Sequence, residues 1–224
     1  RNEEPRDDFL QRVGTAVRAK GGVFMIDEVT AGWRYGFPGG SARLGVPPDI
    51  AVYAKATSNG IPFGAVIGRE EVMDAANSSF ISSSYWTDGL GAAAALACIG
   101  KMQNLPVQKH VWDLGLKLQG GLRALAEGHA ELHIKIGGMP CAPSLVFQRQ
   151  TQAAKVLMIR RMLQRGFMVS PQWYVMWTHD EAQVEAVLAA LDEVLGELAV
   201  LAREERLEKE AGAVPKSSGF ARLA

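Results

Sequence analysis

The sequence predicts an α/β protein in which a mostly parallel sheet with helices is followed by a smaller C-terminal α+β domain. Two short apolar runs, Val23–Ile26 and Ile50–Ala54, show no alternation of polar and apolar residues. Such runs are typical of strands that are buried on both faces of a parallel sheet. After residue 105, helical patterns alternate with short strand-like segments. The first half of the chain is therefore expected to form the parallel sheet with its helices, and the second half the α+β domain.

The first strand-like runs are bounded by clear helix and turn signals. Residues 1–20 have helical spacing of their apolar positions, and Gly21-Gly22 ends that helix. A long loop over residues 30–48 separates the first run from the second, and a third short run covers residues 63–68. Loops of this length are more often functional than merely connecting. Helices are expected over residues 70–76 and 91–103.

The second half reads as a long helix followed by an α+β unit. The patterns predict helices over residues 107–126, 153–164 and 180–203, and strands over residues 132–136, 145–147 and 167–170. We divide the chain into residues 1–104 (the C-terminal part of a large domain), 105–205 (a linking helix and the small domain) and 206–224 (a flexible tail rich in charge, then in Pro, Ser and Gly).

Composition and residue spacing give no sign of a nucleic-acid partner, a membrane partner, a disulfide framework or a metal site. The 224 residues carry 24 basic and 24 acidic side chains, so the total charge gives no reason to expect a nucleic-acid or membrane partner. Cys98 and Cys141 form no disulfide framework and no metal-ligand spacing, which suits a reduced, cytoplasmic protein. His129 and His133 lie four residues apart, but Gly128 and the following strand pattern argue against a shared helix face. No metal site is predicted.

The two apolar runs end in side chains of opposite charge, Asp27 and Lys55. Ligands of open α/β sheets bind beyond the carboxyl ends of the strands, so this acid and this amine are placed where chemistry is expected. Pyridoxal phosphate needs a carboxylate beside its ring nitrogen and a lysine for its aldehyde, and it would account for both residues. Two alternatives stay open here. Asp27 could cap a turn while Lys55 reaches solvent, or Asp27-Glu28 could end the magnesium-binding strand of a P-loop nucleotide hydrolase, although this sequence has no G-x-x-x-x-G-K-[ST] loop.

Four stretches resemble class III pyridoxal-phosphate-dependent aminotransferases of fold type I, including the branch of the glutamate-1-semialdehyde 2,1-aminomutases. Residues 23–34 (VFMIDEVTAGWR) resemble the aspartate motif of that family, and residues 48–65, with AKA at 54–56 and GIPFGA at 60–65, resemble its lysine motif. Residues 80–86 (FISSSYW) resemble the segment that reaches a cofactor phosphate, usually across a dimer interface. Residues 166–171 and 178–180 resemble the end of the small domain. The resemblance covers the C-terminal part of the family pattern only.

The resemblance implies a role for each motif residue. Lys55 would form the Schiff base with pyridoxal 5'-phosphate and move the proton, Asp27 would keep the ring nitrogen protonated, and Val29 would press on one ring face. Ser84, where many relatives carry threonine, would bind the phosphate, and Ser83 could substitute for it. The implied reaction is the transfer of an amino group between an amino donor and a carbonyl acceptor by a homodimer, as a transaminase or an aminomutase.

Two further motif residues are Glu28 and Arg34. Glu28 is expected to be structural or to support the site, and Arg34 either meets a substrate carboxylate or, more simply, anchors the loop with a salt bridge. The chain begins with Arg1 and offers about three strands for the large sheet, where the family builds seven. The alternative to an active enzyme is therefore an incomplete or inactive fragment with the aminotransferase fold, which needs the missing N-terminal half.

Overall fold

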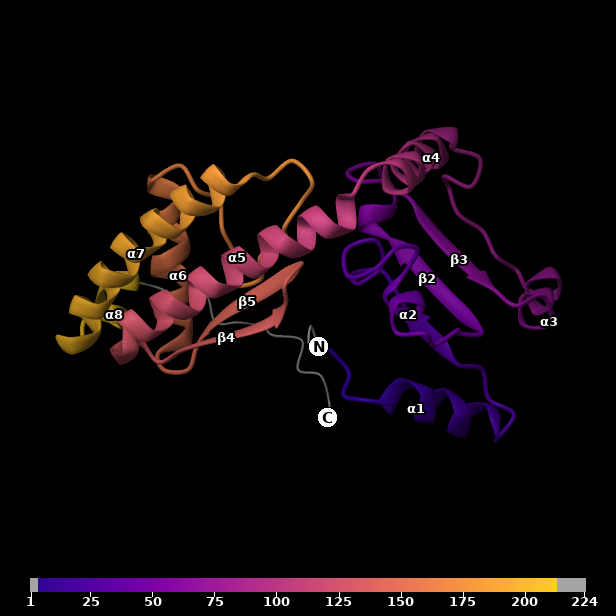
Figure 1. The fold of residues 1–224 in the computed structure, drawn as a ribbon, viewed down its shortest axis with the longest axis horizontal. Helices are drawn as coiled ribbons and strands as arrows, with labels where there is room; N and C mark the ends of the chain where they lie inside the picture. Colours follow the sequence, from indigo (N-terminus) through magenta and orange to yellow (C-terminus); the bar gives the residue numbers. More distant parts are fainter. Residues whose placement is uncertain (1–3, 213–224) are drawn as a thin grey trace. The chain divides into compact units, whose positions relative to one another are not determined.

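The computed structural model describes residues 4–212, which form two compact units, one up to Asp113 and the other from Leu114 (Figure 1). The boundary falls inside helix α5 (Val107–Gly128). The three-part division made from the sequence stays a prediction. None of the helices in the described part of the chain is long and apolar enough to cross a lipid bilayer.

The first unit is built on a three-stranded sheet. Its strands are β1 (Met25–Asp27), β2 (Ile50–Ala54) and β3 (Gly64–Gly68), in the order β1-β2-β3. β1 runs parallel to β2, and β2 runs antiparallel to β3 (Figure 1). The helices of this unit are α1 (Phe9–Arg18), α2 (Gly40–Arg43), α3 (Glu70–Met73) and α4 (Gly89–Asn104), with short 3-10 helices η1 (Lys55–Thr57) and η2 (Asp74–Ser78).

A buried carboxylate holds the start of this sheet together. Asp49 accepts hydrogen bonds from the backbone N–H of Phe24 at 2.9 Å, from Arg18 Nε at 3.0 Å and from Arg69 Nη1 at 3.3 Å. The Phe24 N–H and the two guanidinium groups hold the pKa of Asp49 below its usual value, although burial opposes them. One side chain therefore ties α1 and the residue after β3 to the beginning of β1.

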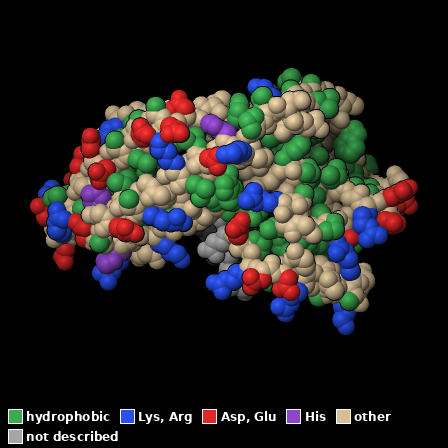
Figure 2. Space-filling model, in the orientation of Figure 1, with side chains coloured by type: hydrophobic (Ala, Val, Ile, Leu, Met, Phe, Trp, Pro, Cys, Tyr) green, Lys and Arg blue, Asp and Glu red, His purple; other side chains and the backbone are tan. Residues whose placement is uncertain are grey.

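The prediction that the first strand is buried on both faces is wrong for this chain. The side chain of Met25 in β1 is 57% exposed, and Val66 and Ile67 in β3 are 54% and 56% exposed. Hydrophobic side chains accordingly gather on the surface where β2 and β3 lie (Figure 2). The physical reason is that β1 is an edge strand among the described residues and the helices cover only part of the sheet.

The second unit packs helices against a β-hairpin. The hairpin consists of β4 (Ile134–Met139) and β5 (Ala142–Phe147), which pair antiparallel, and a 3-10 turn, η3 (Ala130–Leu132), precedes it. The helices after it are α6 (Thr151–Gln164), α7 (Glu181–Arg203) and α8 (Leu207–Ala211). Asp180 begins α7 in a capping box with Gln183. The largest fully buried side chains of this unit lie on the hairpin and on α5 to α7: Leu122, Leu145, Leu157, Met158, Met162, Leu191, Leu195 and Leu198.

Two segments of this unit differ from the sequence prediction. The strand predicted over residues 167–170 does not form, and the next residues lie beside β5 instead. Backbone hydrogen bonds there join Leu145 to Pro171 and Trp173 to Pro143. The tail predicted over residues 206–224 contains a helix that the sequence did not predict, α8, whose residues Leu207 and Ala211, four residues apart, are both buried. The flexibility of the tail stays a prediction. The rest of that tail, from residue 213, lies outside the described residues.

Candidate active site

Asp27 and Lys55 lie at the same edge of the sheet. Asp27 is the last residue of β1, and Lys55 is the first residue after β2. Because these strands are parallel, with Asp27 opposite Val52, their carboxyl ends meet at one edge. Both side chains are exposed.

The amine of Lys55 is held on the loop that leaves Asp27. Lys55 Nζ donates a hydrogen bond of 2.8 Å to Oγ1 of Thr30, which lies three residues after Asp27. The backbone of Lys55 is left-handed, with a φ of 53°. That conformation costs a residue with a side chain roughly 1–3 kcal/mol, and such strain is concentrated at functional sites. The arrangement brings the end of the lysine side chain to the strand tip that carries the acid.

The carboxylate of Asp27 is available to a cationic ligand. Its Oδ1 accepts a local hydrogen bond of 2.9 Å from the backbone N–H of Val29. Within residues 4–212, no Lys, Arg or His side chain forms an ion pair with it. An exposed primary amine and an uncompensated carboxylate on adjacent strand ends are the donor set that the aldehyde and the protonated ring nitrogen of pyridoxal phosphate require. The residues present therefore fit this cofactor.

Glu28 fixes the path of the loop after β1. This side chain is only 1% exposed, and its carboxylate accepts hydrogen bonds from the backbone N–H groups of Gly40 at 2.9 Å and Ser41 at 2.8 Å. A Cβ atom at Gly39 would lie 2.6 Å from Glu28 Oε1, so only glycine fits there. Burial, and then the charge of Glu28, raise the pKa of Tyr53. Glu28 thus pins the first turn of α2 to the strand that carries Asp27.

Arg34 also acts on this loop. Its Nη1 donates a hydrogen bond of 2.8 Å to the backbone carbonyl of Thr30. Thr30 is therefore held twice, through its carbonyl by Arg34 and through its hydroxyl by Lys55. This hydrogen bond is a contact within the loop, and the two roles expected for Arg34, a salt bridge that anchors the loop or a contact with a substrate carboxylate, stay predictions.

The remaining motif residues are Val29, Ser83 and Ser84. Val29 is half-buried on the loop next to Asp27. Ser83 and Ser84 are exposed in the irregular segment before α4, where Ser83 Oγ accepts a 3.4 Å hydrogen bond from the backbone N–H of Tyr85. For the part of the chain described, no hydrogen bond joins either serine to Lys55 or Asp27. The structure thus places Asp27, Val29 and Lys55 at one edge of the sheet, and the role of the two serines stays a prediction.

Sequence reasoning missed the hydrogen bond between Thr30 and Lys55. A signal was present, because a hydroxyl three residues after a strand-ending acid can reach the adjacent strand tip. Of the two histidines at 129 and 133, His129 contacts Asp192, with 2.7 Å between Nε2 and Oδ1. Across residues 4–212, no group of three or more His, Cys, Asp or Glu side chains is arranged to hold a metal ion.

Known proteins that are similar to this chain are aminotransferases. The family model described as Aminotransferase class-III matches residues 3–195. An aminopentol aminotransferase of Sphingopyxis macrogoltabida is 29% identical over 140 residues, which are 62% of this chain and 33% of that protein. The structure of the PLP internal aldimine form of the Sphingopyxis sp. MTA144 FumI protein matches with a TM-score of 0.79 and 24% identity, over 87% of this chain and 47% of that one. An omega-transaminase from Sphaerobacter thermophilus matches with a TM-score of 0.75 and 23% identity, over 89% and 49%.

The matches cover most of this chain but only part of each similar protein. It spans about half the length of the solved structures that it resembles, and a third of the aminopentol aminotransferase. The fold of both units agrees with theirs, and the family match includes the Asp27 and Lys55 motifs. The nucleotide-hydrolase alternative is therefore wrong at the level of the family. The chain belongs to the class III aminotransferase family.

Proposed function

We propose that this chain is the lysine-bearing part of a pyridoxal-phosphate-dependent enzyme that transfers an amino group between an amino donor and a carbonyl acceptor. One observation carries the proposal: the amine of Lys55 and the carboxylate of Asp27 lie on adjacent parallel strand ends, and Thr30 holds the amine at 2.8 Å. Membership of the class III family supports it.

The residues of the chain would divide the work as follows. Lys55 Nζ would hold the aldehyde carbon of the cofactor and afterwards move the proton that leaves the substrate carbon. Asp27 would keep a proton on the ring nitrogen, and Val29 would flank the ring. The hydroxyl of Ser84, or that of Ser83, would donate to the phosphate. When bound, the cofactor supplies an electron sink for the negative charge on the substrate carbon.

The finer predictions remain proposals. The names of the relatives support transfer between two molecules, whereas the glutamate-1-semialdehyde aminomutase branch, an isomerase, rests on the motif resemblance alone. The homodimer is supported by the exposure of Phe80 (97%) and Tyr85 (80%) in the serine-bearing segment. The cytoplasmic location rests on the use of only two cysteines, which make no disulfide framework in the sequence.

Labelling of the lysine tests the proposal directly. The 224-residue chain is incubated with pyridoxal phosphate, reduced with borohydride and mapped by peptide mass spectrometry. We expect the label on Lys55 to exceed that on Lys101, an exposed lysine of α4. Lys55→Arg should remove the main label, and the matched variant Lys101→Arg should leave it. Equal labelling of the two lysines would contradict the assignment of Lys55.

The second candidate is an aminotransferase-fold fragment that has no activity alone. It is favoured by a specific observation, the exposed apolar side chains of β1 and β3 in a chain about half as long as its relatives. The same labelling experiment separates the two candidates. If Lys55 is labelled in the 224-residue chain, the chain alone binds the cofactor. If Lys55 is labelled only in a protein as long as the relatives, this chain supplies part of the site.

A further inference from the structure

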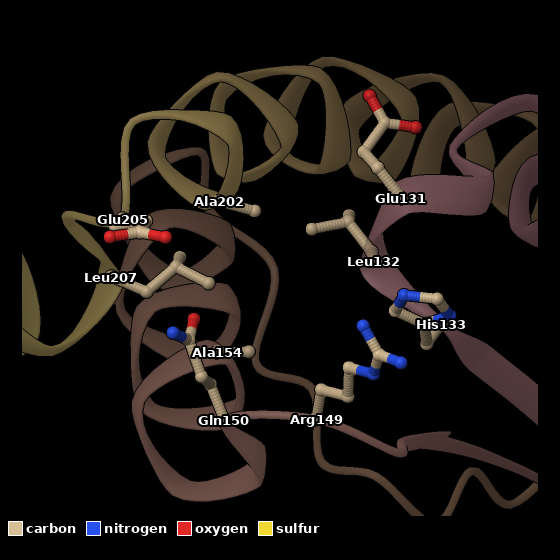
Figure 3. Close-up of a pocket in the computed structure, with 9 residues that line it drawn as sticks. All are labelled: Glu131, Leu132, His133, Arg149, Gln150, Ala154, Ala202, Glu205 and Leu207. Carbon is tan, nitrogen blue, oxygen red and sulfur yellow. The ribbon is translucent and has the colours of Figure 1, made fainter.

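The second unit contains a pocket of about 190 Å³ that the proposed function does not use (Figure 3). Four segments form it: the turn from η3 into β4, the start of α6, the end of α7 and the start of α8. All of its lining residues belong to the second unit, whereas Lys55 and Asp27 belong to the first.

The pocket has an apolar centre and two polar sides. Leu132, Ala154, Ala202 and Leu207 surround its centre (Figure 3). On one side, the guanidinium of Arg149 points toward the ring of His133, and the carboxylate of Glu131, which is paired with Arg203, lies beyond Leu132 (Figure 3). On the opposite side lie the carboxylate of Glu205 and the amide of Gln150 (Figure 3). A ligand with a carboxylate at one end, a short hydrocarbon body and a cation at the other end matches this distribution.

The charged groups on the two sides of the pocket, Arg149 and Glu205, form no ion pair within the described part of the chain. Neighbouring arginines are paired: Arg161 and Arg165 with Glu197, and Arg203 with Glu131. Among the residues that the structure describes, neither Arg149 nor Glu205 has an ion pair or a side-chain hydrogen bond. Arg161, Arg165, Arg203 and Arg206 are thus neutralised by carboxylates, whereas Arg149 faces the pocket.

The backbone gives an independent indication. His133, Gln150 and Glu205 have left-handed φ values of 47°, 43° and 55°, in a region that glycine occupies without steric cost. Elsewhere in the described part of this unit, every left-handed position is a glycine: Gly138, Gly166 and Gly212. The three exceptions all line this one pocket. Long polar side chains are therefore kept at positions where local structure favours glycine, which indicates that the side chains themselves are needed.

We propose that this pocket binds a small zwitterion, an amino carboxylate whose two charges are separated by a short methylene chain. Its carboxylate would be held by Arg149 and His133, its methylenes would cover Leu132 and Leu207, and its ammonium would face Glu205. The site is separate from the amino-transfer chemistry of the first unit, and it does not depend on the cofactor.

Calorimetric titration of the 224-residue chain with 5-aminopentanoate tests the proposal. We expect saturable binding with a Kd on the order of 1 mM, because the open pocket leaves both charges partly screened. Pentanoate and pentylamine each carry one of the two charges and should bind about tenfold more weakly. Arg149→Gln should weaken the binding of 5-aminopentanoate about tenfold. Glu205→Gln should weaken the binding of 5-aminopentanoate but not that of pentanoate. Lys55→Ala should leave the Kd of 5-aminopentanoate at this pocket unchanged.

Glycine variants separate a loss of binding from a loss of folding. His133→Gly and Glu205→Gly relieve a strained backbone, so each should leave the melting temperature unchanged or raise it while it weakens binding. Asn59→Gly, at a φ of 47° in the first unit, is the matched control and should leave binding unchanged. The proposal is overturned if no saturation occurs below about 10 mM, if Arg149→Gln binds like the wild type, or if Lys55→Ala abolishes binding.

Discussion

Residues with side chains adopt left-handed backbones in both candidate sites, and in the first unit also at Asp7, Trp33 and Asn59. In the first unit Lys55 has this conformation and carries the amine of the candidate active site, and in the second unit all three such residues with side chains line one pocket. Local preference is overridden where a side chain has to be in a given place. The contact between Lys55 and Thr30 makes the first of these positions testable.

Thr30→Val should release the amine of Lys55. Valine keeps the shape of threonine but removes the hydroxyl that accepts the 2.8 Å hydrogen bond. One hydrogen bond contributes about 0.5–1.5 kcal/mol, so the rate at which acetic anhydride modifies Lys55 should rise roughly two- to tenfold. Thr30→Ser should restore the wild-type rate. Competitive labelling against Lys101 gives the ratio by mass spectrometry, and an unchanged ratio in Thr30→Val would show that the hydroxyl does not hold the amine.

The sequence predicted the positions of Asp27 and Lys55, but not the contacts of Glu28 and Thr30. Strand ends can be read from local apolar runs, and the geometry of parallel strands then places their tips at one edge. The partners of Glu28 lie 12 and 13 residues away in the chain, at Gly40 and Ser41. Those contacts depend on how the whole loop closes, which no local pattern in one sequence specifies.

At the scale of elements, glycines decide how closely α5 packs. A Cβ atom at Gly115 would lie 2.1 Å from the carbonyl oxygen of Pro140, at the turn between β4 and β5, whereas a Cβ at Gly120 would meet nothing within 4 Å. The sequence predicted a helix over residues 107–126, but its glycines look alike until the hairpin is in place. The same lack of tertiary information explains the misplaced strand at residues 167–170, whose neighbours pair with β5 only through isolated contacts.

Gly115→Ala and Gly120→Ala should therefore have opposite effects on stability. The added methyl at position 115 meets a backbone atom that cannot rotate away, which should lower the free energy of unfolding by about 1–3 kcal/mol. At position 120 the same change only improves helix propensity and should raise it by about 0.5–1 kcal/mol. Urea denaturation followed by circular dichroism measures both. Equal stability of the two variants would mean that α5 does not approach the hairpin at Gly115.

At the scale of the whole molecule, the two units differ in how well they cover their apolar residues. The second unit has a closed core between its helices and its hairpin, whereas the first leaves β1 and β3 largely bare. The fold class was predictable because it follows from short buried-type runs and helical periods. The exposure was not, because an apolar run indicates what a strand would bury and not whether this chain supplies the covering layer.

The bare sheet predicts that the 224-residue chain associates with itself in solution. Val66 and Ile67 are consecutive residues of β3, so their side chains point to opposite faces of the sheet, and both are more than half exposed. Val66→Thr keeps the β-branched shape that strands favour and removes one exposed apolar group, so it should shift sedimentation-velocity profiles toward the monomer. The free energy of unfolding should change by no more than about 0.5 kcal/mol. Val200→Thr, at an exposed position of α7, is the matched control and should leave the profile as it is. A monomeric wild-type chain at all concentrations, or an equal shift in Val200→Thr, would mean that the sheet surface does not drive association.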